Sequence, residues 1–584
     1  MHTAPGAVTR RSLPLNCQPE GNAARGSVRP VRAADLHLRS GPGNVQRMVG
    51  ATGCVRSRTV VPSLAVIGIV LIGCGGRAFE SGAAAATAAH DEIVWHAGDV
   101  DSAFAAARAA GKPVLLYWSA DWCPPCSRLK ATVFRSPEFV ARTKLFVAVH
   151  LDGDEPGAQR LGEQFDVYGY PTVVVLSPDR EEITRIATTM ETAQYVHALD
   201  LALAASRPAS AAYAAVLGGA ATDADLRLLA YYSWSQDRER LVAEPQLSAA
   251  LKALEAAYPP HLAVEKSRLF MAFLAAHAVA AANQGKTALL SGDELPWARV
   301  RLREILHDPA LIEANSLAVV YGAHWAFAMV AQPADAGSAA LAAAWEAVLA
   351  GMRADPASSA VTRIATLYGT LCLLGARQPD HAPPAPLVRA VHREVREADR
   401  ATDDPYARMT LFSVAYHALS AAGLYDEAYD FMTREVERSH SPDYIMLALA
   451  RWTQWKGLPP EALSWAERAW REARGPATRF ERGTAYVHML AQLTPDAGAR
   501  IEDTVIALFR EASKAQDAFY LRTTRYLHRL ENYLRAWNAD GTRAPSMARI
   551  RSEVAAICGA MADAGPSRTT CRTFLANQAP EPAI

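Results

Sequence analysis

Few cysteines and no excess of charge limit what this chain can be. Its 584 residues hold 60 basic and 60 acidic side chains, so the chain as a whole lacks the basic surface with which proteins bind nucleic acids. Eight cysteines are too sparse for a fold held together mainly by disulfides. A chain of this length does not form one single core, so two or more domains are expected.

The apolar run near the N-terminus is too short to cross a bilayer comfortably. It covers residues 60–72 and follows Arg56 and Arg58, whereas a spanning helix needs about 20 apolar residues. A basic region before a short apolar one is typical of a secretory signal peptide, which we place at residues 48–73. Residues 1–47 are rich in Arg, Pro and Gly without apolar periodicity, and we interpret them as a non-native or disordered leader.

The signal ends in Leu71-Ile-Gly-Cys74, which resembles the lipobox of bacterial lipoproteins. The resemblance implies that Cys74 is lipidated and becomes the mature N-terminus. Gly75 after it implies an anchor in the outer membrane that faces the periplasm. An ordinary signal peptide cleaved nearby, or a signal anchor, are the alternatives. Residues 74–91 are predicted to form a flexible tether.

The motif Cys123-Pro-Pro-Cys126 lies between a predicted strand at 113–118 and a predicted helix at 127–134. The unpaired N–H groups and the dipole of a helix start favour a thiolate, so Cys123 is the expected nucleophile. Cys126 lies three residues on and is expected to close a disulfide with it and to resolve mixed disulfides. A zinc half-site or an inert structural disulfide are the alternatives. Zinc needs four ligands, and no second Cys-x-x-Cys or close Cys/His pair follows.

The surroundings of this motif resemble a thioredoxin fold over residues 92–205. Predicted strands at 145–151, 172–176 and 182–186, and a proline loop at 168–172, follow in the order of that family. Further predicted elements are an entering strand at 92–96 and helices at 99–110, 156–165 and 191–205.

The resemblance implies roles for several residues. Pro171 is expected to be a cis-proline beside the disulfide, and Trp122 the flat hydrophobic residue beside the nucleophile. Tyr170, Pro124 and Pro125 are expected to contact the substrate. Simple packing is the alternative for Trp122. No cofactor other than the redox-active disulfide is implied, and no metal.

Two features bear on the chemistry of the pair. Tyr117 stands where thioredoxin has a buried aspartate six residues before the first cysteine, so proton exchange with Cys126 needs another acid or water. The two prolines lack the histidine of oxidants such as DsbA, which favours a reducing or mid-potential protein. The segment from Ala120 to Phe134 resembles the C-terminal reductase domain of DsbD, which implies a membrane-embedded thiol transporter as electron donor. An oxidising role is the main alternative.

After a predicted linker at 206–222, residues 223–584 are predicted to be α-helical. Two Gly-Leu-x-x-Glu-Ala segments start at Gly423 and Gly457, 34 residues apart, and lie between apolar helices. This period resembles tetratricopeptide repeats. Such helix pairs stack into an α-solenoid with a surface that binds partners.

Cys558 and Cys571 are predicted to form a structural disulfide near the C-terminus. As a whole, the sequence predicts a periplasmic, lipid-anchored thiol-disulfide oxidoreductase, a reductase or isomerase of protein disulfides, with a helical domain for docking. Its expected partners are proteins with dithiols or disulfides and a membrane thiol donor, and no nucleic acid. One alternative is an envelope scaffold in which the helical repeats bind partners and the thioredoxin fold serves for docking. Another is a role in the maturation of copper or haem proteins.

Overall fold

The computed structural model describes residues 92–576, except 189, 238–239, 285–287, 333–334, 379–380 and 563–564. The predictions for the leader, the signal peptide, the tether and the lipidated Cys74 therefore lie outside the described residues. The described residues all belong to one unit of the chain. We call residues 92–205 the sheet domain and residues 206–576 the helical region.

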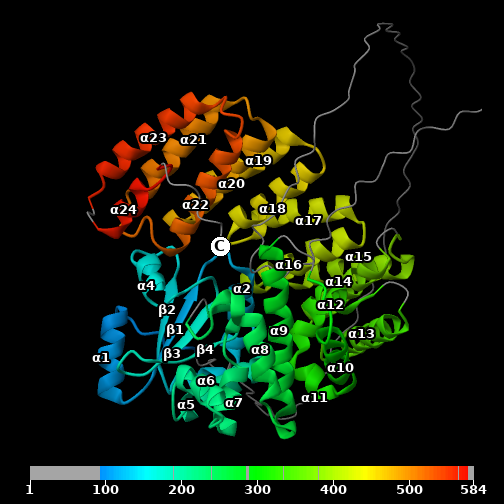
Figure 1. Cartoon of the computed structure of the whole chain (residues 1–584). Coiled ribbons are helices and arrows are strands. Elements are labelled where there is room, and N and C mark those ends of the chain that lie inside the picture. Colours follow the sequence, from blue (N-terminus) through cyan, green and yellow to red (C-terminus); the bar gives the residue numbers. More distant parts are fainter. Residues whose placement is uncertain are drawn as a thin grey trace, which may run out of the picture. The chain divides into compact units, whose positions relative to one another are not determined.

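A four-stranded sheet forms the centre of the sheet domain (Figure 1). Its order is β2-β1-β3-β4, with β2 parallel to β1 and with antiparallel pairs between β1 and β3 and between β3 and β4. The central β1 is buried along its whole length, as its continuous apolar sequence predicts. The strands are β1 (Val114–Ser119), β2 (Val147–Asp152), β3 (Thr172–Leu176) and β4 (Glu182–Ile186).

Side chains alternate between the two faces of this sheet, and helices cover both. Leu115 and Tyr117 pack with Leu129 of α2 on one face, whereas Leu116 and Trp118 pack on the other. The sheet domain is therefore a three-layer thioredoxin fold, as the sequence predicts. Its helices are α1 (Val100–Ala110), α2 (Pro124–Ala131), α3 (Pro137–Thr143), α4 (Ala158–Gln164) and α5 (Thr192–Ala204).

Two elements differ from the prediction by more than two residues. The expected strand at 92–96 is reduced to a single bridge between Trp95 and Ala148. Helix α2 begins at Pro124 and not at 127, because Cys123 already serves as its N-cap. Proline suits the first helical position, where its missing N–H would have no partner within the helix. The prolines of the motif thus start the helix and do not delay it.

Residues 231–233 cover the open edge of β4. The N–H of Ala187 donates to the carbonyl of Tyr231 at 3.1 Å, and the N–H of Ser233 donates to the carbonyl of Arg185 at 2.8 Å. An antiparallel bridge joins Ile186 to Tyr232. The first part of the helical region therefore completes the hydrogen bonding of the sheet.

The helical region follows the sheet domain without a long loop. Helix α6 forms within the segment 206–222 that was predicted as a linker, where an Ala-rich stretch follows Pro208. Its helices are α6 (Ala209–Leu217), α7 (Asp223–Ala230), α8 (Leu247–Ala256), α9 (Ala263–Asn283), α10 (Glu294–His307), α11 (Pro309–Ala314), α12 (Ser316–Val330), α13 (Ala336–Ala354), α14 (Ala360–Arg377), α15 (Ala385–Ala401), α16 (Pro405–Ala421), α17 (Tyr425–Arg438), α18 (Pro442–Trp455), α19 (Pro459–Glu472), α20 (Pro476–Leu493), α21 (Gly498–Ala512), α22 (Leu521–Trp537), α23 (Ala544–Gly559) and α24 (Pro566–Arg572). None of the helices in the described part of the chain is long and apolar enough to cross a membrane.

The glycines that start the two Gly-Leu-x-x-Glu-Ala segments lie in the turns between helices. Gly423 has φ 77° between α16 and α17, and Gly457 has φ 76° between α18 and α19. Glycine adopts this left-handed conformation at no steric cost, and it commonly ends a helix for that reason. The structure thus has the two predicted helix pairs, while their membership of the tetratricopeptide class stays a prediction. Further on, a disulfide between Cys558 and Cys571 joins α23 to α24, with 5.6 Å between the Cα atoms.

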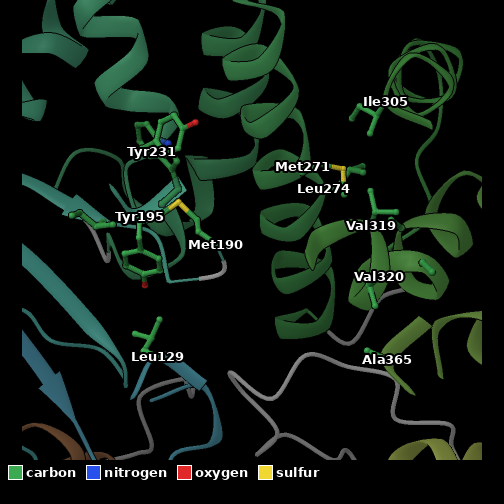
Figure 2. Close-up of a cluster of buried hydrophobic side chains, with 14 of the residues drawn as sticks. Leu129, Met190, Tyr195, Tyr231, Met271, Leu274, Ile305, Val319, Val320 and Ala365 are labelled. Carbon is green, nitrogen blue, oxygen red and sulfur yellow. The ribbon is translucent and has the colours of Figure 1, made fainter. Parts of the chain in front are cut away.

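The apolar core of the sheet domain continues into the helical region. One cluster of buried side chains runs from Ile93 to Leu449. Figure 2 draws members from both regions, among them Leu129 and Tyr195 from the sheet domain and Met271 and Val319 from α9 and α12. Helices α19–α24 contribute mainly to a separate apolar cluster of their own. The sheet domain thus shares one buried cluster with helices up to α18, while Leu521 of α22 packs on its other cluster.

Candidate functional site

The two cysteines of the motif form a disulfide at the start of α2. Their Cα atoms are 5.2 Å apart. Cys123 has an extended backbone, and its Sγ accepts a hydrogen bond from the N–H of Cys126 at 3.1 Å. A sulfur in this N-cap position faces the positive end of the helix, so the geometry favours the thiolate of Cys123 when the pair is reduced.

The disulfide is almost fully buried. Cys123 is 2% exposed and Cys126 is 1% exposed. Both pack with Ala120, and the rings of Trp122 and Tyr170 lie against them. Two of the predicted site residues are thus in contact with the sulfur pair.

Tyr170 of the proline loop packs against the disulfide. The peptide bond between Tyr170 and Pro171 is cis. The Tyr170 ring meets that of Trp122 edge to face, with 6.4 Å between the centroids. The Tyr170 hydroxyl accepts a hydrogen bond from Nε2 of Gln159 at 3.1 Å, and burial raises its pKa. The carbonyl of Pro171 accepts a hydrogen bond from Nε2 of Gln236 at 2.8 Å, so the helical region reaches this loop. Contact of Tyr170, Pro124 and Pro125 with a substrate stays a prediction.

Trp122 is held by residues of the helical region. Its Nε1 donates to Oγ1 of Thr478 at 2.8 Å, and its ring stacks on that of Tyr444 with 6.2 Å between the centroids. The guanidinium groups of Arg482 and Arg522 lie 5.0 and 5.4 Å from the Trp122 ring. Packing, the alternative for this residue, is thus part of its role. The sequence carries no local signal for partners that lie more than 300 residues away.

Buried ion pairs surround this tryptophan. Arg522 pairs with Asp154 at 2.9 Å, and Arg482 pairs with Asp443 at 2.9 Å and with Glu481 at 2.6 Å. Burial alone would lower the pKa of Arg522, but Asp154 and other neighbours raise it above its ordinary value. Both arginines therefore stay charged, as buried guanidinium groups require paired carboxylates.

Three titratable side chains lie on the α2 face of the sheet. Burial raises the pKa of Tyr117, so this residue does not supply a proton at neutral pH. His150 stacks on Tyr117 with 5.1 Å between the centroids, and its Nε2 is hydrogen-bonded to Oγ of Ser119 at 2.7 Å. Burial lowers the pKa of His150 to about 4. Burial raises the pKa of Asp152 to about 6.

Asp152 is a carboxyl group that was not among the predicted site residues. It pairs in register with Ser119, because β1 and β2 are parallel and end at the same edge of the sheet. Helix α2 begins at that edge, and Lys130 of α2 affects the pKa of both Asp152 and His150. Its position at the end of the strand after the motif could have predicted an acid at this edge of the sheet. Tyr117 indicated only that the aspartate of thioredoxin is absent.

The described residues hold no group of three His, Cys, Asp or Glu side chains placed to bind a metal ion. The chemistry that this arrangement offers is that of two sulfurs at a helix start, with a carboxyl group at the same edge of the sheet. Such a site defines the class of thioredoxin-like domains.

Comparison with known proteins agrees with this class. Residues 94–178 match the family model described as thioredoxin-like. The chain is 35% identical over 85 residues to thiol:disulfide interchange protein DsbD 1 of Pseudomonas aeruginosa, a match that covers 14% of each chain. It is 31% identical over 109 residues to thioredoxin-related protein DsbJ of Chlamydia pneumoniae, which covers 17% of this chain and 31% of the relative.

Among solved structures, a thioredoxin from Thermus thermophilus is 26% identical, with a TM-score of 0.18, over 19% of this chain and 85% of that one. The chain thus spans less than a third of the length of these two curated relatives. The likeness concerns the sheet domain and leaves the helical region without a match among these proteins.

Proposed function

We propose that this protein is a periplasmic thiol-disulfide oxidoreductase that reduces or isomerises protein disulfides. The observation that carries the proposal is the disulfide between Cys123 and Cys126 at the start of α2, with Tyr170 of the cis-proline loop packed against it. The similarity to DsbD and DsbJ supports it. The proposed electron donor is a membrane-embedded thiol transporter.

The reaction starts when a donor dithiol reduces the Cys123–Cys126 disulfide and is itself oxidised to a disulfide. The Cys123 thiolate then attacks one sulfur of a substrate disulfide, and the other substrate sulfur leaves as a thiolate. Cys126 loses its proton and attacks Sγ of Cys123. The substrate's second sulfur leaves, and the two electrons of the cysteine pair have passed to the substrate.

Asp152 is the proposed acceptor of the Cys126 proton, directly or through water. A carboxyl group with a pKa of about 6 is ionised at neutral pH and still basic enough to take a proton. This assigns the task that the buried aspartate has in thioredoxin to the neighbouring strand, since Tyr117 cannot perform it. The helix start provides the other part of the catalysis, because it stabilises the thiolate of Cys123.

The test uses the purified full chain with dithiothreitol as donor and insulin as the disulfide substrate. We expect the wild type to accelerate insulin reduction and Cys123→Ser to abolish the effect. Cys126→Ala should accumulate mixed disulfides through Cys123, visible on non-reducing gels and by mass spectrometry of the Cys123 peptide. Insulin reduction at the rate of dithiothreitol alone would contradict the proposal.

We also propose the location and anchor. Lipidation of Cys74 would place the chain on the outer membrane, with the helical region free to dock substrates. Labelling of cells with radioactive palmitate, followed by membrane fractionation, tests this. We expect label in the outer-membrane fraction for the wild type and none for Cys74→Ala.

One observation favours a second candidate function. A disulfide that is 1–2% exposed is placed like a structural one, which agrees with a scaffold whose helical region binds partners. In that case Cys123→Ser would leave the cellular phenotype of the gene intact, whereas loss of residues 410–475 would abolish it. If the protein is an oxidoreductase, Cys123→Ser should abolish the cellular phenotype.

A further inference from the structure

We infer that helices α20–α22 form a lid that closes the disulfide site and that the lid must open before a partner thiol can reach Cys123. The inference rests on the proposed function for its purpose, but the geometry that supports it does not. A thiolate must approach a disulfide along the S–S axis, and Cys123, only 2% exposed as a residue, is too buried for such an approach. We call residues 476–537 the lid.

Asp154 is the point where the lid is fastened. Its two carboxylate oxygens accept hydrogen bonds from the N–H and Oγ1 of Thr478, at 2.8 and 2.6 Å. Nη2 of Arg522 donates to the same carboxylate at 2.9 Å. Thr478 lies on α20 and Arg522 on α22, so one side chain of the sheet domain holds both helices. Trp122 joins this group through its hydrogen bond to Thr478.

A second set of polar contacts binds the lid to α4 and the proline loop. The N–H of Gln159 donates to Oδ2 of Asp517 at 2.9 Å, and the Gln159 side chain accepts from the N–H of Arg522 at 3.1 Å. The N–H of Leu521 donates to Glu163 at 3.1 Å. Arg525 donates to the carbonyl of Tyr168. These contacts surround the loop that presses Tyr170 on the cysteines.

Few apolar side chains join the lid to the sheet domain, whereas the lid shares an apolar cluster with α19, α23 and α24, so these helices would move with it. The first helices share one apolar cluster with the sheet domain, whereas α20–α22 belong to the cluster of the last helices. Leu521 adds an apolar contact with the cluster around α4. Its φ of 42° is a left-handed conformation that costs a leucine energy. A polar and strained contact of this kind is typical of segments that open locally while the core stays folded.

The lid defines what a partner has to displace. Opening removes Arg522 from the rings of Trp122 and Tyr170, which pack against the sulfur pair, and frees the carboxylate of Asp154. A partner protein that brings a cysteine to Cys123 would take up the surface that Thr478 and Arg522 cover in the closed state. The same helices thus protect the Cys123–Cys126 disulfide from thiols that cannot compete with this contact.

Two glycines offer a matched test. Gly475 precedes α20 with φ 78°, and a Cβ added there would lie 2.3 Å from Cβ of Asp154. Gly457 has nearly the same φ, 76°, and a Cβ added there would meet nothing within 4 Å. Gly475→Ala and Gly457→Ala both place an alanine at positive φ, but only the first adds a Cβ that meets Asp154.

The experiment measures how fast iodoacetamide alkylates Cys123 in the reduced full chain, by mass spectrometry of the Cys123 peptide. We expect Gly475→Ala to react about tenfold faster than Gly457→Ala and the wild type, as expected when a population of open molecules rises by that factor. We also expect wild-type Cys123 to react more slowly than in the chain unfolded by guanidinium chloride. Equal rates for the two glycine variants would overturn the lid.

A second pair of variants applies if Gly475→Ala does not fold. Thr478→Val removes the hydroxyl that bonds Asp154 and Trp122. Thr484→Val, on the same helix, removes a buried hydroxyl that has no hydrogen-bond partner among the described residues. Faster alkylation for Thr478→Val alone supports the lid, and equal rates contradict it. Alkylation does not depend on catalysis, so a chain that shows the lid effect but leaves insulin oxidised would refute the proposed function and not the lid.

Discussion

The substitution Asp152→Asn tests whether the carboxyl group beside α2 is as unusual as its surroundings imply. Asparagine has nearly the same shape and keeps the oxygen that accepts the hydrogen bond from the N–H of Asp154 at 2.9 Å. It never ionises. The variant therefore removes the charge and little else.

The expected change in stability follows from the pKa of Asp152. Burial raises the pKa of Asp152 from 3.8 to about 6. A change of about two pKa units, at about 1.4 kcal/mol each, gives an upper value of about 3 kcal/mol for the cost of the charge in the folded protein. Because Asp152 is only partly shielded from water, we expect a gain of about 1 to 3 kcal/mol for the variant at neutral pH.

The difference in stability between Asp152→Asn and the wild type depends on pH. A carboxyl group with a raised pKa takes up a proton more readily in the folded than in the unfolded state, so it favours folding at low pH. This contribution is lost as the pH rises from about 4 through about 6. The variant should therefore match the wild type near pH 4 and exceed it in stability above pH 6. His150, whose pKa is lowered to about 4, changes stability in the opposite direction over this range, but it is present in both proteins and cancels in the difference.

Thermal unfolding of the oxidised proteins at pH 4.5 and pH 7.5 is the assay. Asp101→Asn serves as control, because that carboxylate is 82% exposed and its ion pair with Arg180 lies on the surface. The control should leave the difference between the two pH values unchanged. A midpoint for Asp152→Asn below that of the wild type at pH 7.5, or an equal shift at both pH values, would refute the reasoning.

Three further predictions concern stability. Replacing Cys558 and Cys571 together by Ala should cost up to about 3 kcal/mol, because their disulfide closes a short loop, and dithiothreitol should then no longer lower the unfolding temperature of α23–α24. Arg185→Met should cost about 3 kcal/mol or more, because it removes a fully buried guanidinium and leaves the partly buried Glu182 with one partner fewer, and an unfolding midpoint equal to the wild type would contradict this. Arg135→Ala removes an ion pair whose arginine is 54% exposed; we expect a change below about 1 kcal/mol in the same assay.

The sheet domain was largely predictable because its elements carry local signals. The strands at 172–176 and 182–186 have the predicted bounds, since each is a run of strand formers and a tight turn joins them. The helix predicted at 99–110 forms as α1, with Asp99 as its N-cap and Gly111 as its C-cap. The prediction of a strand at 92–96 was wrong, because a pattern of strand formers does not reveal how much of a neighbouring strand is available for pairing.

The surroundings of the disulfide could not be predicted in the same way. Thr478 and Arg522 meet Trp122 and Asp154 only because the chain returns to the sheet domain after more than 300 residues. Nothing in the local pattern of α20 or α22 distinguishes these side chains from those of a solvated helix. The motif predicts the chemistry of Cys123, whereas its accessibility depends on packing between distant segments.

The backbone hydrogen bonds that residues 231–233 make along β4 have a consequence for any attempt to isolate the thioredoxin-like part. A fragment that stops at residue 205 would expose the free edge of β4 and the apolar side chains that pack on the first helices. Unpaired strand edges beside apolar patches recruit other strands, so such a fragment would associate with itself. A usable excised module would have to extend at least through Ser233.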